Sequence, residues 1–131
     1  METDQLRLRF SATVSPSEDP RKVLAAMKNI VGDCDFHLEE AAGSIEISSS
    51  SIRCIQKVHD QLRDRHVRDA ARRLLLRSQD GDSLRLLFNR QAAAAGVIVV
   101  CASELESPLG PIVLEIQAAK VQELIDWLTT H

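Results

Sequence analysis

The sequence has few aromatic residues: three phenylalanines, one tryptophan and no tyrosine in 131 residues. Its core must therefore consist mainly of Leu, Ile, Val and Ala, and few rings remain to stack on nucleic-acid bases. No apolar run approaches the ~20 residues that span a bilayer. Residues 1–10 alternate charged and apolar positions and do not form a signal peptide. These absences predict a soluble, cytoplasmic protein.

Cysteine is also scarce, with Cys34, Cys54 and Cys101 far apart along the chain. No CxxC pair occurs, so the spacing suggests neither a zinc site nor a disulfide framework. Free cysteines are usually buried, and cytoplasmic thiols stay reduced. We therefore expect three buried thiols, no metal and no cofactor.

Charge is unevenly distributed along the chain. The net charge of −3 argues against a generally adhesive nucleic-acid binder. Residues 53–90, however, hold ten Lys and Arg against five acidic residues, whereas the remainder holds six against fourteen. One segment is therefore basic within an acidic protein, and a specific anionic partner would bind there.

The length fits one domain, residues 1–131, without a dividing linker. Period-two alternation predicts strands over 6–14, 36–40, 44–48, 84–88 and 112–116, and a β-branched run predicts a buried strand over 97–102. Helical periodicity predicts helices over 20–31, 52–62, 67–75, 89–95 and 121–128, and a register shift near Asp64 indicates that 52–75 forms either two helices or one bent helix. Asp19 and Pro20 are placed to begin the first helix. Hairpin-like pairs mixed with crossover helices predict an α+β fold, with a mainly antiparallel or mixed sheet and helices packed on one face.

An arginine cluster is the strongest candidate for a binding site. Its members are Arg65, Arg68, Arg72 and Arg73. At about 100° per residue, the first three share one sector beside the apolar stripe of their helix. Guanidinium groups form forked hydrogen bonds to phosphate oxygens, so this face could hold an RNA backbone. The alternative is a solvated face tied by local pairs with Asp64 and Asp69.

A second candidate is the strand-to-helix junction Asn89-Arg90-Gln91. Backbone N–H groups at a helix start favour an anion, and Arg90 would add a positive charge. The alternative is that Asn89 caps the helix and Arg90 decorates the surface.

The sequence offers no catalytic constellation. It contains no Gly-x-Ser-x-Gly elbow, no GxGxxG loop and no Walker-type loop. His59 and His66 are seven residues apart, which does not match the i, i+4 spacing of a helical metal pair. We therefore expect a protein that is not an enzyme.

Four segments resemble a known family. They are 68–72 (RDAAR), 88–93 (FNRQAA), 108–112 (PLGPI) and 124–128 (LIDWL). In order and spacing they resemble the small archaeal family of uncharacterised proteins often labelled predicted RNA-binding or exosome-linked. This resemblance implies an α+β fold similar to that of the large-subunit ribosomal protein that contacts 5S RNA.

We therefore expect an RNA-binding or ribonucleoprotein accessory protein that recognises RNA backbone and shape through its Arg-rich helix. The residues expected to contact structured RNA are Arg65, Arg68, Arg72, Arg73, Asn89, Arg90 and Gln91. Contacts to phosphates imply weak sequence preference and strong salt dependence. An alternative is a protein–protein interaction module, a homodimer, in which an edge strand such as 112–116 pairs with a second copy. A small anionic ligand at Asn89 is a third reading.

Overall fold

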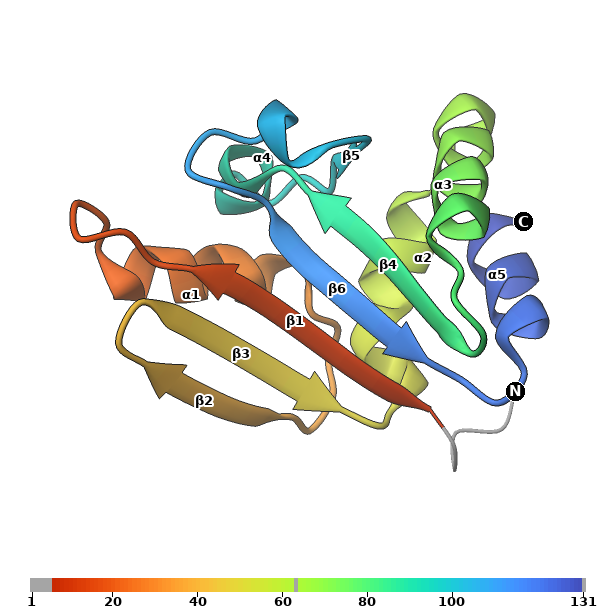
Figure 1. Cartoon of the computed structure of the whole chain (residues 1–131), viewed down its shortest axis with the longest axis horizontal. Helices are drawn as coiled ribbons and strands as arrows, with labels where there is room; N and C mark the ends of the chain where they lie inside the picture. Colours follow the sequence, from red (N-terminus) through yellow and green to blue (C-terminus); the bar gives the residue numbers. More distant parts are fainter. Residues whose placement is uncertain (1–5, 63, 131) are drawn as a thin grey trace.

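The computed structural model describes residues 6–62 and 64–130, which form an α+β fold (Figure 1). The strands are β1 (Arg7–Thr13), β2 (His37–Ala41), β3 (Ser44–Ser49), β4 (Ser83–Phe88), β5 (Val100–Cys101) and β6 (Ile112–Gln117). The α-helices are α1 (Pro20–Ile30), α2 (Gln56–Gln61), α3 (Arg65–Ser78), α4 (Arg90–Ala94) and α5 (Val121–Thr129). Two 3-10 turns are η1 (Ile52–Ile55) and η2 (Glu104–Glu106). The predicted α+β class is confirmed.

The strands form one antiparallel sheet in the order β2-β3-β1-β6-β4-β5. In Figure 1, α1 and α2 lie behind this sheet and leave its front face uncovered. Alternate side chains of the central strands are buried: Leu8, Phe10, Leu84, Leu86, Phe88, Ile112, Leu114 and Ile116. Their neighbours on the other face, such as Arg7 and Arg9, are exposed. The period-two pattern thus places the aliphatic core between the sheet and the helices.

Aspartate side chains cap the starts of α1 and α3, and the sequence predicted the first of these caps. The side chain of Asp19 accepts a hydrogen bond from the Arg21 N–H at 2.9 Å, and Pro20 occupies the first turn of α1. The side chain of Asp64 accepts hydrogen bonds from the N–H groups of His66 and Val67 at the start of α3. This second cap begins α3 as a helix separate from α2, so of the two alternatives near Asp64 the structure has two helices and not one bent helix.

Strand β6 lies inside the sheet. It pairs with β1 on one side and with β4 on the other. The prediction that residues 112–116 form an edge strand is therefore wrong, because alternation along one strand does not determine which strands flank it. Within the described residues, the sheet ends at β2 and β5.

The segment 97–102 is only partly a strand. Val100 and Cys101 pair with β4, but Val97 and Val99 have exposed fractions of 50% and 44%. The Val97 N–H donates to the Ala92 carbonyl at 2.9 Å and so closes the end of α4. The predicted buried strand is wrong over 97–99 and at Ala102, because this segment lies at the sheet edge and leaves side chains such as Val97 and Val99 in solvent.

The cysteines differ from expectation. Cys34 and Cys54 form a disulfide, and Cys101 is free and buried. Burial, together with the negative charge of Glu106, raises the pKa of the Cys101 thiol. The prediction of three free thiols is wrong, because the fold brings together two cysteines that are separated by 20 residues and belong to no local motif.

Candidate nucleic-acid interface

The outer face of α3 presents positive charge to solvent. Ala71 and Leu75 are fully buried on the inner side of this helix. Arg73 and Arg77 are exposed on the opposite side, four residues apart and therefore adjacent on the helix surface. Among the described side chains of α3, the exposed arginines are thus Arg73 and Arg77, which lie about 100° or more around the helix from Arg72.

Part of the predicted arginine sector faces another helix. The Nη1 group of Arg72 donates to Oδ1 of Asp126 at 2.9 Å and to Oγ1 of Thr129 at 3.1 Å, both on α5. The side chains of Arg72 and Asp126 are 36% and 53% exposed, so water screens this ion pair. Arg68 is half-buried on the same flank. The side chain of Arg65 lies outside the described residues. Arg72 therefore links α3 to α5.

A small hollow adjoins the exposed arginine pair. It has a volume of about 170 Å³ and lies between α3 and the end of β4, with Arg77, Ser78 and Arg85 among its lining residues. The Ser78 hydroxyl accepts a hydrogen bond from the Arg85 N–H at 2.9 Å and so holds the end of α3 on the edge of β4. The Arg85 guanidinium also bonds to Glu104 at 3.2 Å, with both side chains about half exposed. Arg73, Arg77 and Arg85 form what we call the α3–β4 rim.

At the Asn89-Arg90-Gln91 junction, two of the three side chains serve the fold. The Asn89 Oδ1 accepts a hydrogen bond from the Ala92 N–H at 2.9 Å, so Asn89 caps α4 as in the alternative reading of the sequence. Gln91 is exposed. Arg90 is only 4% exposed. Burial removes Arg90 from the surface that was predicted to contact phosphate.

Arg90 instead joins three segments of the chain. Its Nη1 donates to the Thr13 carbonyl at 2.7 Å and to both carboxylate oxygens of Glu18 at 2.9 and 2.8 Å. Its backbone N–H donates to the Ser107 hydroxyl at 3.0 Å. Burial acts to raise the pKa of Glu18, but hydrogen bonds from Ser15 and Arg90 and the Arg90 charge hold that pKa below its ordinary value. Sequence reasoning missed this pair, whose members are 72 residues apart and belong to no local motif.

The uncovered face of the sheet is polar. A hollow of about 430 Å³ lies there, with Arg7, Arg9, Glu115 and Gln117 among its lining residues. The Arg9 guanidinium contacts Glu115 at 2.6 Å and Glu46 at 3.2 Å. The hydrogen bond to Glu115 and the negative charge of that residue raise the pKa of Arg9. These carboxylates partly neutralise Arg9, so this face is a poorer phosphate surface than the exposed Arg73 and Arg77 of α3.

The aromatic side chains do not form a stacking platform. Phe10 and Phe88 are buried, and Trp127 stacks on His59 with ring centroids 4.4 Å apart. Phe36 is 36% exposed and directly precedes β2, at the opposite end of the sheet from β4 and the α3–β4 rim. Binding at the α3–β4 rim would therefore depend on charge and shape.

The described part of the chain shows neither a metal cluster nor a membrane-spanning helix. Within residues 6–62 and 64–130, no group of three or more His, Cys, Asp or Glu side chains could hold a metal ion. No helix in the same ranges is long and apolar enough to cross a membrane.

Comparison with known proteins identifies relatives over nearly the whole chain. A UPF0201 protein from Sulfurisphaera tokodaii is 42% identical over 126 residues, covering 94% of this chain and 86% of that protein. The UPF0201 protein from Sulfolobus acidocaldarius is 37% identical over 126 residues, with the same coverage of the two chains. The crystal structure of the UPF0201 protein from Methanococcus jannaschii has the same fold, with a TM-score of 0.77, 24% identity and coverage of 95% and 93% of the two chains.

A family model described as RNA binding also matches residues 7–118, which include β1 through β6 and the α3–β4 rim. The resemblance noted in the sequence is thereby confirmed at the level of the family. The chain belongs to the UPF0201 family of archaeal proteins, whose family model is described as RNA binding.

Proposed function

We propose that this chain is a non-enzymatic RNA-binding protein, an accessory of ribonucleoprotein particles, that holds RNA phosphates on the α3–β4 rim. The observation that supports this best is the exposure of Arg73 and Arg77 on one face of α3, within the region matched by the RNA-binding family model. Arg85 extends the positive surface across the end of β4. Arg68 and Arg72 border this positive surface on the α5 side, where Arg72 forms an ion pair with Asp126.

The proposed mode is recognition of RNA backbone and shape. Each guanidinium offers a planar fork of N–H donors that matches phosphate oxygens. Aromatic rings to splay and stack bases are absent from the residues of the rim, so sequence preference should be weak. The family resemblance suggests structured RNA as the ligand, in an RNA-processing assembly such as the exosome or in a ribonucleoprotein like the ribosome.

Charge reversal of Arg73→Glu/Arg77→Glu should lower RNA affinity at low salt by at least about tenfold, because phosphate contacts and released counterions are lost. For single strands, the slope of log K against log salt should fall in magnitude by about 1 to 2. The measurement is fluorescence anisotropy with single-stranded and hairpin RNA across a salt series.

The matched control is Arg21→Glu/Lys22→Glu. These residues are exposed on α1, away from α3, and their reversal changes the net charge by the same amount. The affinity of this control variant for RNA should remain close to that of the wild type. Equal losses in both variants would show a general charge effect, and an unchanged affinity of the α3 variant would remove the rim from the proposal.

A second candidate is a homodimeric interaction module, supported by exposed apolar side chains between α4 and β6. Val97, Val99, Leu105 and Leu109 are 44–96% exposed, which is unusual for large apolar residues gathered in one short stretch. In sedimentation equilibrium, a dimer should appear at twice the mass of one chain. Leu105→Glu should convert it to a monomer, whereas Leu76→Glu on α3 should not. A monomer mass at all concentrations of the wild type would reject this candidate.

A further inference from the structure

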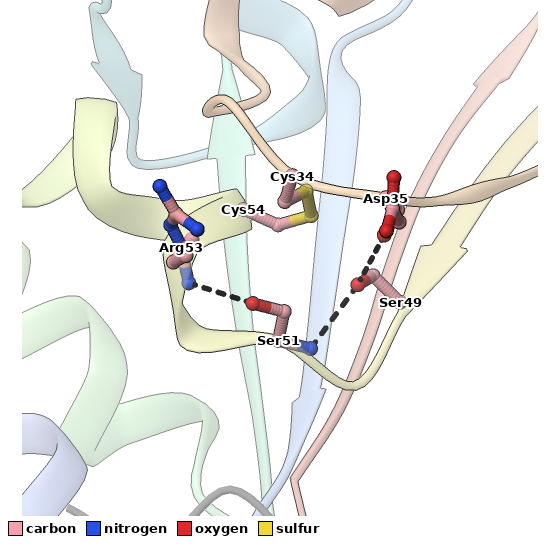
Figure 2. The surroundings of a disulfide bond; sticks show 6 residues. All are labelled: Cys34, Asp35, Ser49, Ser51, Arg53 and Cys54. Atoms are coloured by element: carbon pink, nitrogen blue, oxygen red, sulfur yellow. Dashed lines mark hydrogen bonds between the residues drawn. A yellow bond between two sulfur atoms is a disulfide. The ribbon is translucent and has the colours of Figure 1, made fainter.

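The disulfide closes a loop around the edge of the sheet. Cys34 lies between α1 and β2, and Cys54 lies in η1, after β3. The bond therefore encloses the whole β2–β3 hairpin, including the edge strand β2. Figure 2 shows the two side chains meeting at the base of this hairpin.

The two segments that carry the cysteines approach closely for reasons independent of sulfur. The Gly32 N–H donates to the Cys54 carbonyl at 2.8 Å. A Cβ atom on Gly32 would lie 1.9 Å from the Arg53 carbonyl oxygen, so no larger residue fits without moving the backbone. The Cα atoms of Cys34 and Cys54 are 5.4 Å apart, which suits a disulfide. These backbone contacts therefore place Cys34 and Cys54 within disulfide-bonding distance of each other in the folded chain.

The strand inside this loop has little other anchorage. Among the described residues, β2 pairs with β3 alone. Leu38 is half-buried, and the other four residues of the strand are exposed. At the base of the hairpin, the Ser49 hydroxyl donates to the Asp35 carbonyl at 3.0 Å and accepts from the Ser51 N–H at 3.1 Å (Figure 2). Few buried contacts and an exposed ladder indicate a low free energy of local opening.

By contrast, β3 is held on both sides. It pairs with β1 over six residues, and Ile45 and Ile47 are buried in the core. If the Cys34–Cys54 disulfide is reduced, β2 can leave the sheet while β3 stays.

We propose that the Cys34–Cys54 disulfide is a redox-responsive clamp on the sheet edge. In the oxidised protein it holds β2 against β3. Reduction by a dithiol releases β2 locally and exposes the edge of β3, while the central strands keep their pairing.

The two cysteines differ in residue exposure, which gives the reduction a direction. Cys34 is half-buried, whereas Cys54 is fully buried. An incoming thiolate therefore forms a bond to Sγ of Cys34, the disulfide breaks, and its electron pair leaves on Sγ of Cys54, which takes a proton from solvent. The second thiol of the dithiol, as its thiolate, then displaces Cys34. The protein gains two electrons and two protons, and the dithiol becomes a cyclic disulfide.

The test is hydrogen exchange of the wild type with and without dithiothreitol, with labelling for minutes. After reduction, amides of β2 should exchange at least about tenfold faster, while those of β1 and β6 stay protected over the same minutes. The variant Cys34→Ala/Cys54→Ala serves as the control and should match the reduced protein in both buffers. Unchanged exchange in β2 would overturn the clamp, as would equal loss of protection in all strands.

The direction of attack has a separate test in single variants. Cys34 in Cys54→Ala should react with iodoacetamide at least about tenfold faster than Cys54 in Cys34→Ala. Cys101, buried and with a raised pKa, is the slow internal reference in both. Equal rates at the two positions would refute attack at Cys34.

Discussion

Replacing Glu18 with alanine should lower the free energy of unfolding by about 3 to 5 kcal/mol, the usual cost of leaving one member of a buried ion pair alone. The side chains of Glu18 and Arg90 are 10% and 5% exposed. Without Glu18, the guanidinium would keep only the Thr13 carbonyl, because its Nε and Nη2 have no hydrogen-bond partner among the described residues. Urea denaturation at neutral pH measures the loss.

A double variant separates the pair from its neighbourhood. Glu18→Leu/Arg90→Met replaces both charges with apolar groups of similar size, so it should be more stable than Glu18→Ala. A double variant as unstable as the single one would show that the loss comes from packing and not from the unpaired charge.

The same pair predicts how stability depends on pH. The pKa of Glu18 in the folded protein lies below the ordinary value of 4.5. Its contribution is therefore complete above about pH 4.5 and is lost as the pH falls through the lower, folded-state pKa. Glu18→Gln should weaken the loss of stability at acid pH. Part of that loss should remain, because the hydrogen bond from the Arg21 N–H lowers the pKa of Asp19 as well.

The sequence predicts the parts of this fold that depend on local periodicity and capping. Alternation in β1 and β4 follows directly from apolar side chains at every second position, and Asp19 followed by Pro20 marks the start of α1. These signals act within a few residues, and they do not encode neighbours in space. For that reason the central position of β6 and the exposure of 97–99 could not be read from the sequence.

The candidate site shows the same limit. The sequence shows that α3 is basic, but which of its arginines face solvent and which contact α5 depends on where α5 packs. Asp126 draws Arg72 toward α5, and Arg73 and Arg77 are left facing water. The i, i+4 spacing of that pair was a signal that could have placed the rim. Nothing comparable marks Arg90, whose partners Glu18 and Thr13 come from the other end of the chain.

Removing the disulfide should cost about 3 kcal/mol of unfolding free energy, since a loop of this size restricts the unfolded chain by roughly that amount. For a domain of this length, the melting temperature of Cys34→Ala/Cys54→Ala should fall by about 10 °C. Calorimetry of the wild type in dithiothreitol should give nearly the same melting temperature as the variant without reductant. Cys101→Ala is the control, because it removes a buried sulfur but leaves the loop closed. A fall in the variant that reduction of the wild type does not reproduce would assign the loss to side-chain packing around Cys54, and chain entropy would then have no part in it.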